Sequence, residues 1–233
     1  MKPETNGDEQ LNLRVKICGI TRLADAELAT ELGADVLGFV FFEKSPRNIS
    51  FADAAKIIEK LPTHIRKIGV FVNPKYAFAA EAVRIAGLDA IQLHGIYGDA
   101  NFLKINDLPT VLAIAVDENG LDKRSAKLLP KADAVLLDAH HPTQHGGTGR
   151  TFNWQFAAAH SRQQPIILAG GLNPANIRSA VETVRPFAVD VSSGVEASPG
   201  VKDATKLKQF FKKIEAFRND RHEEIREFFP ISR

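Results

Sequence analysis

The feature that most constrains this sequence is a short apolar run followed by a helical pattern, repeated about eight times along the chain. The runs are nearly continuous rather than alternating, which is typical of parallel strands covered on both faces. The expected strands are residues 15–18, 36–41, 67–72, 90–93, 111–114, 134–137, 166–169 and 188–191.

The segments between these runs carry apolar residues at helical spacing. Some also have typical helix ends: Ser50 is a good N-cap residue, and Gly33 stands where a helix C-terminus favours glycine. The expected helices are residues 24–32, 51–61, 76–86, 121–129, 154–160, 175–183 and 203–217.

Strands that alternate with crossover helices predict an α/β fold with a parallel sheet, either a closed barrel or a doubly wound open sheet. The even length of the units and the glycines after strands six, seven and eight favour a single (β/α)8 TIM barrel. An open Rossmann sheet would place its glycine-rich turn after strand one, where this chain has Cys18-Gly19-Ile20-Thr21.

Three segments are expected along the chain: a flexible extension over residues 1–12, one barrel domain over 13–217, and a charged stretch over 218–233. The last stretch is expected to be either an added helix or a loose tail. The extension has no apolar core of a signal peptide, and the single cysteine fits a reducing compartment, so we expect a soluble cytoplasmic protein.

The charges exclude some classes of partner. The 30 basic and 28 acidic residues are interspersed, with a net charge of +2, which does not suit a nucleic-acid binder. No apolar run is long enough to predict a membrane span. A small phosphorylated molecule is the expected ligand, without a metal or organic cofactor, and the sequence leaves a monomer and a homodimer open.

Residues that end barrel strands on the carboxyl side point into the active-site mouth. These positions hold a thiol, a carboxylate, a guanidinium, an amide–imidazole pair and three glycine-rich turns. They are Cys18, Arg47, Asn73, Gln92, His94, Asp138, Gly147, Gly149, Gly170, Gly171, Ser192, Ser193 and Gly194. An acid, a base and anion anchors are what an isomerase of an anionic substrate needs.

The turns Gly146–Gly149, Gly170–Gly171 and Ser192–Gly194 each follow a strand and precede a helix. Glycine lets backbone N–H groups approach an oxyanion, and the helix N-terminus adds to the attraction. One such cluster is explained by a tight turn, whereas three on neighbouring strands predict a phosphate site.

Cys18 is either a small buried hydrophobe or a catalytic base. Lys16, two residues earlier, shares its face of the strand and is expected to be among the residues that bind the ligand. Such a cation is also expected to lower the pKa of the thiol toward neutrality. Asp138 is either a loop cap or a functional acid, because a carboxyl group after an apolar strand is costly unless it is solvated, paired or used.

Other polar residues have weaker indications. Asp190 lies within a strand and is expected to make a structural bond inside the barrel. Arg47 is either a surface arginine or a bidentate clamp for a carboxylate. The three histidines His140, His141 and His145 have no standard zinc-ligand spacing and are expected to be solvated.

Several stretches together resemble the phosphoribosylanthranilate isomerase family, which acts in tryptophan synthesis from chorismate. The resemblance runs in order from about Val15 to Phe217. It is carried by residues 15–21, 37–41, 45–47, 69–73, 92–95, 136–138, 146–149, 168–172, 190–196 and 199–203.

The resemblance implies a (β/α)8 barrel and an Amadori rearrangement of N-(5-phosphoribosyl)anthranilate to 1-(2-carboxyphenylamino)-1-deoxyribulose 5-phosphate. It implies that Cys18 is the general base, that Asp138 is the general acid, and that Arg47 holds the anthranilate carboxylate. The stretch after Phe217 is longer than the family leads us to expect, and it has no assigned role.

Three other classes are disfavoured by particular residues. The related isomerase of histidine synthesis has aspartates in both catalytic roles, whereas this chain has Cys18. Metal-dependent pentose-phosphate epimerases need inward histidines and aspartates on strands that end here in Phe41 and Asn73. A binding module without turnover is expected to lack Cys18 or Asp138, and both are present.

Overall fold

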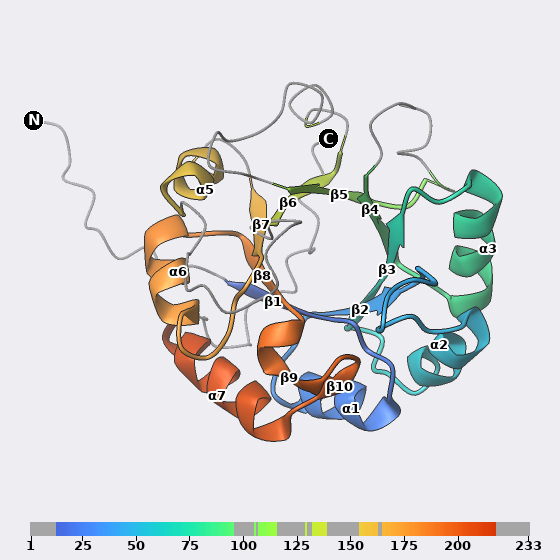
Figure 1. Cartoon of the computed structure of the whole chain (residues 1–233), viewed down its shortest axis with the longest axis horizontal. Coiled ribbons are helices and arrows are strands. Elements are labelled where there is room, and N and C mark those ends of the chain that lie inside the picture. The colour runs from blue at the N-terminus through green and yellow to red at the C-terminus, as the bar shows by residue number, and fades with distance from the viewer. Residues whose placement is uncertain are drawn as a thin grey trace, which may run out of the picture.

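Eight parallel strands close into one barrel in chain order, which confirms the predicted fold (Figure 1). The computed structural model describes residues 13–95, 105, 107–115, 129, 132–138, 154–162 and 165–217. The strands are β1 (Arg14–Cys18), β2 (Val36–Val40), β3 (Arg66–Val72), β4 (Ala90–His94), β5 (Thr110–Ala115), β6 (Ala134–Asp138), β7 (Ile166–Ala169) and β8 (Ala188–Val191). The barrel closes where β1 pairs with β8, from Arg14 opposite Ala188 to Ile17 opposite Val191.

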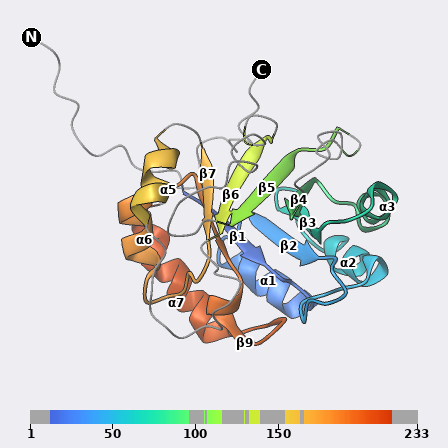
Figure 2. The ribbon, with the colours of Figure 1, turned by 45° about the horizontal axis from the view of Figure 1, so that its top comes forward.

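The helices lie outside the barrel and cover its outer face (Figures 1 and 2). They are α1 (Leu23–Glu31), α2 (Phe51–Ile58), α3 (Tyr76–Ala86), α5 (Trp154–Ser161), α6 (Ile177–Val184) and α7 (Ala204–Ile214), with 3-10 turns η3 (Ser193–Val195) and η4 (Glu215–Phe217). The extension 1–12, the helix expected over 121–129 apart from Leu129, and the stretch 218–233 lie outside the described residues.

Local side-chain bonds explain where two of these helices begin. The Ser50 hydroxyl accepts the N–H of Asp53 at 3.1 Å, so the predicted N-cap of α2 is confirmed. Helix α6 begins two residues later than predicted, because Asn173 uses its side-chain oxygen to accept the N–H of Ala175 at 2.8 Å. This turn satisfies the backbone before the helix starts.

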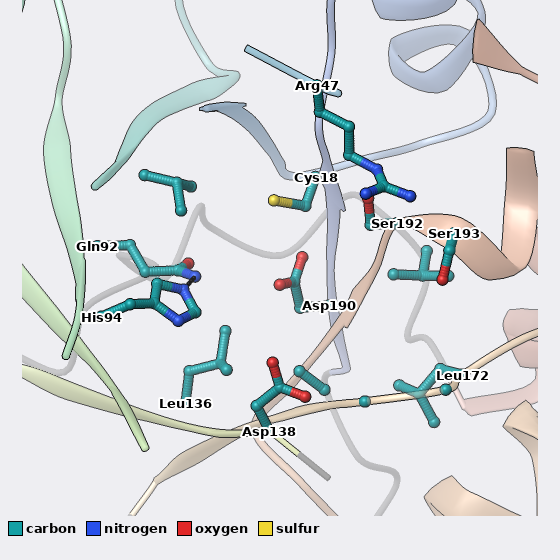
Figure 3. Close-up of a pocket in the computed structure, with 15 residues that line it drawn as sticks. Cys18, Arg47, Gln92, His94, Leu136, Asp138, Leu172, Asp190, Ser192 and Ser193 are labelled. Atoms are coloured by element: carbon teal, nitrogen blue, oxygen red, sulfur yellow. Dashed lines mark hydrogen bonds between the residues drawn. The ribbon is translucent and has the colours of Figure 1, made fainter. Parts of the chain in front are cut away.

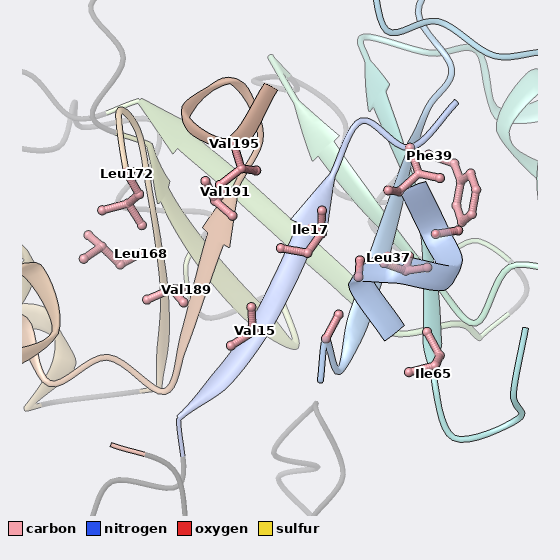
Figure 4. Packing of buried hydrophobic residues seen from close by; sticks show 14 of the residues in the cluster. Val15, Ile17, Leu37, Phe39, Ile65, Leu168, Leu172, Val189, Val191 and Val195 are labelled. Atoms are coloured by element: carbon pink, nitrogen blue, oxygen red, sulfur yellow. The ribbon is translucent and has the colours of Figure 1, made fainter. Parts of the chain in front are cut away.

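The core has two layers, because side chains alternate across each strand. One layer packs between the strands and the helices, and Figure 4 shows Val15, Ile17, Leu37 and Phe39 as part of it. The other fills the barrel interior. Its residues are Val36, Ile68, Ala90, Val111, Ala113, Ala134, Leu136, Ile167, Ala169 and Ala188. The strands therefore surround a packed interior, and the open space lies at their ends.

A short hairpin that the sequence did not predict interrupts the repeat between β8 and α7. Its strands β9 (Glu196–Ser198) and β10 (Val201–Lys202) are antiparallel. It lies beside α1 in Figure 1, and the Thr21 hydroxyl donates to the carbonyl of Gly200 at 2.5 Å. The hairpin thus joins the end of the barrel to its beginning. Among the described residues, no helix has the length and apolar character needed to cross a bilayer.

Candidate active site

A pocket of about 220 Å³ opens at the carboxyl ends of the barrel strands (Figure 3). It brings together most of the residues that the sequence singled out. The lining residues are Cys18, Arg47, Val70, Gln92, His94, Leu136, Asp138, Ala169, Gly170, Gly171, Leu172, Asp190, Val191, Ser192 and Ser193. Asp190 was expected to have a structural role only, and it also faces this pocket.

Cys18 ends β1 and is 8% exposed, so its thiol meets the pocket but little bulk water. Lys16 lies two residues earlier on the same inner face and is fully buried. It does not line the pocket, although the sequence placed it among the ligand-binding residues. Its ammonium group instead donates to Asp190 at 2.9 Å, which confirms the expected structural bond of Asp190 inside the barrel.

A glycine opposite Cys18 leaves room for this arrangement. Gly38 pairs with Cys18 across β1 and β2. A Cβ atom at position 38 would lie 3.0 Å from the Cys18 sulfur and 3.1 Å from the Lys16 nitrogen. These distances are shorter than ordinary contacts, so glycine at 38 allows the thiol and the ammonium group to lie side by side.

Burial raises the pKa of Cys18, because ionisation would place a negative charge in a nearly water-free site. Lys16 and Lys202 oppose this rise, and Asp190 adds to it. The sequence-based expectation of a lowered pKa was therefore wrong. The position of Lys16 was read correctly, but the sequence did not show that Asp190 compensates the lysine charge.

Asp138 ends β6 and lines the pocket, where it is partly exposed. In the view of Figure 3, the Asp190 carboxylate lies between Asp138 and Cys18. A thiol and a carboxyl group thus face one pocket from strands on different sides of the barrel. This is the arrangement that acid–base chemistry on a bound molecule requires.

Gln92 and His94 both face the pocket from β4, and their side-chain nitrogens lie 2.8 Å apart. Burial, together with the charge of the nearby Lys16, lowers the pKa of His94 to about 4. The imidazole is therefore neutral at physiological pH. The Gln92 side-chain oxygen is buried and has no partner among the described residues, so it is an available acceptor beside the pocket.

The glycine-rich and serine-rich turns are divided between the pocket and the scaffold. Gly170 and Gly171 follow β7 with positive φ angles of 87° and 66°, and they line the pocket together with Ser192 and Ser193. Gly194 lies against the backbone of Leu172, where a side chain would collide, and it is outside the lining. Gly147 and Gly149 lie outside the described residues.

Arg47 reaches the pocket from the loop after β2, and its guanidinium group is paired with Glu196. The two nitrogen–oxygen distances are 2.8 and 2.6 Å, which makes the contact bidentate. Glu196 also accepts a hydrogen bond from Lys202 at 2.9 Å. No role was predicted from the sequence for Glu196 or Lys202, although both stand within stretches that carry the family resemblance.

The described part of the chain has no cluster of three or more histidine, cysteine, aspartate or glutamate side chains that could hold a metal ion. What the pocket offers is a thiol, two carboxylates, a guanidinium group and several turns with backbone donors. These groups can exchange protons with an anionic molecule and bind its charges.

The sequence of the chain matches the family described as N-(5'-phosphoribosyl)anthranilate (PRA) isomerase over residues 15–213. The chain belongs to this family. The N-(5'-phosphoribosyl)anthranilate isomerase of Geobacter sulfurreducens is 45% identical over 213 residues, which cover 88% of this chain and 100% of that protein. The enzyme of Pelobacter propionicus is 47% identical and covers 86% of this chain and 94% of its own length.

Solved structures of the family are similar to this chain in fold. The crystal structure of the phosphoribosyl anthranilate isomerase from Thermotoga maritima is 42% identical, has a TM-score of 0.79, and covers 87% of this chain and 98% of that chain. A crystal structure of a phosphoribosyl anthranilate isomerase in complex with reduced 1-(o-carboxyphenylamino)-1-deoxyribulose 5-phosphate is 40% identical, with a TM-score of 0.75, and it covers 87% of this chain and 98% of that chain. The chain thus shares both its sequence family and its barrel fold with known isomerases.

Proposed function

We propose that Cys18 and Asp138 carry out the proton transfers by which this isomerase converts N-(5-phosphoribosyl)anthranilate to 1-(2-carboxyphenylamino)-1-deoxyribulose 5-phosphate in tryptophan biosynthesis. The observation that carries the proposal is that both side chains line one pocket, from the ends of β1 and β6. The membership of the chain in the family supports the reaction.

The first step needs an acid. Asp138 donates a proton to the ring oxygen of the ribose, the bond between this oxygen and C1′ breaks, and the nitrogen lone pair forms an iminium at C1′. The partial exposure of Asp138 suits this role, because a carboxyl group at the pocket wall can regain its proton from solvent.

The second step needs a base. The Cys18 thiolate removes the proton at C2′, the electron pair moves into the iminium, and the enolamine formed tautomerises to the ketone. Burial disfavours the thiolate in the free protein, and the ammonium group of Lys16 is the adjacent charge that favours it. Burial alone would lower the pKa of Lys16, but Asp190 and Cys18 raise it, so the lysine is charged.

The substrate has two anionic ends, and the pocket lining holds groups that suit each of them. Gly170, Gly171, Ser192 and Ser193 form one wall, and backbone N–H groups in such turns bind phosphate. Arg47 reaches the lining from the loop after β2, near Ser192, and its guanidinium group suits the planar carboxylate. A relative was crystallised with a phosphorylated compound that carries both groups. Binding both ends orients the reacting carbons between base and acid.

Two substitutions test these roles. Cys18→Ala and Asp138→Asn are each expected to lower kcat by about 10²–10⁴-fold, the usual contribution of a general acid or base, while KM changes little. The loss of substrate fluorescence measures the rate, and thermal unfolding shows whether each variant is folded. Normal kcat in either variant contradicts its assigned role.

The pH profile gives an independent test of the base. Because burial raises the pKa of Cys18 above its ordinary value of 9.0, kcat/KM is expected to keep rising with pH through the neutral range as the thiolate fraction grows. This rise should be absent from the residual activity of Cys18→Ala. A rise that persists unchanged in this variant assigns the ionisation to another group.

A further inference from the structure

The guanidinium group of Arg47 is held on one edge by a buried carboxylate from a distant part of the chain. Glu196 is 6% exposed and begins the hairpin that follows β8. Its two oxygens accept from the Nε and Nη2 atoms of Arg47 at 2.8 and 2.6 Å. Of the described residues, none occupies the Nη1 atom of Arg47, so the second edge of this group is available in the pocket.

The carboxylate of Glu196 is itself fixed by several groups. Lys202 donates to it at 2.9 Å, and the N–H of Gly200 lies 3.3 Å from the same oxygen. The Lys202 ammonium also donates to the carbonyls of Cys18 at 2.6 Å and Ser192 at 3.3 Å. The hairpin is therefore bonded to the end of β1 and to the residue that follows β8, and Glu196 has little freedom to move.

The charges of this cluster do not cancel. Burial alone would raise the pKa of Glu196, but hydrogen bonds from Arg47 and the charge of Lys202 lower it, so the carboxylate is ionised. Two cations around one anion leave one positive charge. A second carboxylate that meets the open edge of Arg47 therefore finds a net attraction, and the guanidinium need not leave Glu196.

The backbone beside Arg47 is shaped to admit this geometry. A Cβ atom at Gly19 would lie 2.6 Å from the Cδ atom of Arg47. Gly19 also has a φ of 76°, which glycine adopts readily. The arginine side chain thus passes closely over the turn after β1 toward Glu196.

We propose that Glu196 is a positioning residue for substrate recognition, which holds the guanidinium group of Arg47 so that its open edge meets the carboxylate of the anthranilate ring. The inference rests on the proposed function, in which Arg47 binds this carboxylate. An arginine side chain has many rotamers in water, and fixing it beforehand removes an entropic cost from binding.

The test compares two substrates that differ only in the carboxylate, N-(5-phosphoribosyl)anthranilate and N-(5-phosphoribosyl)aniline. Glu196→Gln is expected to raise KM for the anthranilate compound by about tenfold, with kcat within about twofold, since a charge-assisted bidentate contact is lost. KM for the aniline compound should stay within about twofold of wild type. Chromatography of the aminoketose products measures both rates.

Matched variants separate the causes. Glu182→Gln removes an exposed carboxylate paired with Arg178 on α6 and should change neither KM. Glu196→Asp keeps the charge but shortens the side chain, so it should also raise KM selectively for the anthranilate compound. Thermal unfolding identifies folded variants, and Glu196→Asp serves as the test if Glu196→Gln does not fold.

Two outcomes would overturn the inference: an unchanged KM for both substrates, or an equal rise for both, which indicates a general structural role. Arg47→Met tests the underlying assignment separately, because it should abolish the preference for the anthranilate compound. If Arg47→Met affects both substrates equally, the proposed role of Arg47 fails. In a double variant, Glu196→Gln should add nothing to Arg47→Met, because the positioned group is absent.

Discussion

The two ends of the barrel handle charged residues in different ways. At the amino ends of the strands, an aspartate precedes each of β2, β4 and β6, and each bonds to the strand before it. Asp35 accepts the N–H of Val15 at 2.8 Å and donates its own N–H to the carbonyl of Val15 at 2.9 Å. Asp89 makes the same pair of bonds with Lys67, and Asp133 makes it with Thr110.

Among the described residues, the mouth has no such repeat. Its ion pairs form two dissimilar clusters, Lys16 with Asp190 and Glu196 with Arg47 and Lys202. The carboxylates of Asp190 and Glu196 are at least nine-tenths buried, whereas the Asp35 and Asp89 side chains are 20% and 27% exposed.

The difference shows that the amino ends meet a repeated structural need, whereas the charged residues of the mouth are arranged around one bound molecule. Before β2, β4 and β6 the same problem recurs, because an N–H group at the start of the preceding strand needs an acceptor, and an aspartate solves it each time. A single bound molecule has no such symmetry, so the residues around it differ from strand to strand. The following predictions test this division.

The largest effect on stability is expected in the mouth. Asp190→Asn leaves the fully buried Lys16 without its counter-charge and should lower the free energy of unfolding by about 3–5 kcal/mol. Urea denaturation measures this. Asp53→Asn, which removes an exposed partner of Lys56, is the control and should leave the free energy of unfolding nearly unchanged. Equal effects of the two variants would break the comparison.

The second prediction concerns pH. Burial lowers the pKa of His94 from 6.5 to about 4, so between these values the unfolded chain binds a proton that the folded chain does not. Stability should fall as the pH decreases through this window, by up to about 3 kcal/mol. Urea denaturation from pH 7 to 4 measures the slope. His94→Asn should reduce it, and an unchanged slope would contradict the origin in His94.

The third prediction concerns the opposite end. Asp35→Ala removes the acceptor for the N–H of Val15 and should lower the free energy of unfolding by about 1–2 kcal/mol with unchanged kcat. Asp35→Asn keeps an oxygen acceptor and should lose less. Activity and urea denaturation of both variants are measured together. A loss of kcat in folded Asp35→Ala would show that the two ends are coupled.

The smallest effect is expected outside both ends. Arg178→Ala removes an exposed ion pair with Glu182 on α6 and should change stability by at most about 0.5 kcal/mol. Thermal unfolding gives the difference. A larger loss would show that helix surfaces contribute to stability as much as the aspartates at the amino ends.

The fold was predictable because its signal is repeated and local. The predicted strand 188–191 and helix 76–86 have the observed bounds of β8 and α3. The hairpin 196–202 was not predictable in this way, because its strands are two and three residues long and its bonds reach Arg47 and Cys18, far away in sequence. Hydrophobic periodicity carries no information on such short elements.

The sequence was enough to predict many of the residues that line the pocket, but not which of their charged groups form ion pairs. Strand ends placed Cys18, Asp138, Gln92 and His94 in the mouth, because the position of a residue along a barrel strand decides its depth. Which carboxylate meets which cation depends on contacts between residues as distant as Lys16 and Asp190. For this reason the direction of the Cys18 pKa shift was missed. The aspartates before β2, β4 and β6 recur regularly, and this signal was readable in the sequence.

Cys18 is the only sulfhydryl in the 233 residues, and it opens on the pocket. A thiol reagent that modifies one group per chain therefore reports on a single defined location. In folded protein, the fraction of Cys18 that is modified gives the fraction of molecules whose pocket is accessible. A compound that fills the pocket should slow this modification. The same atom that is proposed to take a proton thus gives a chemical readout of occupancy that needs no engineered probe.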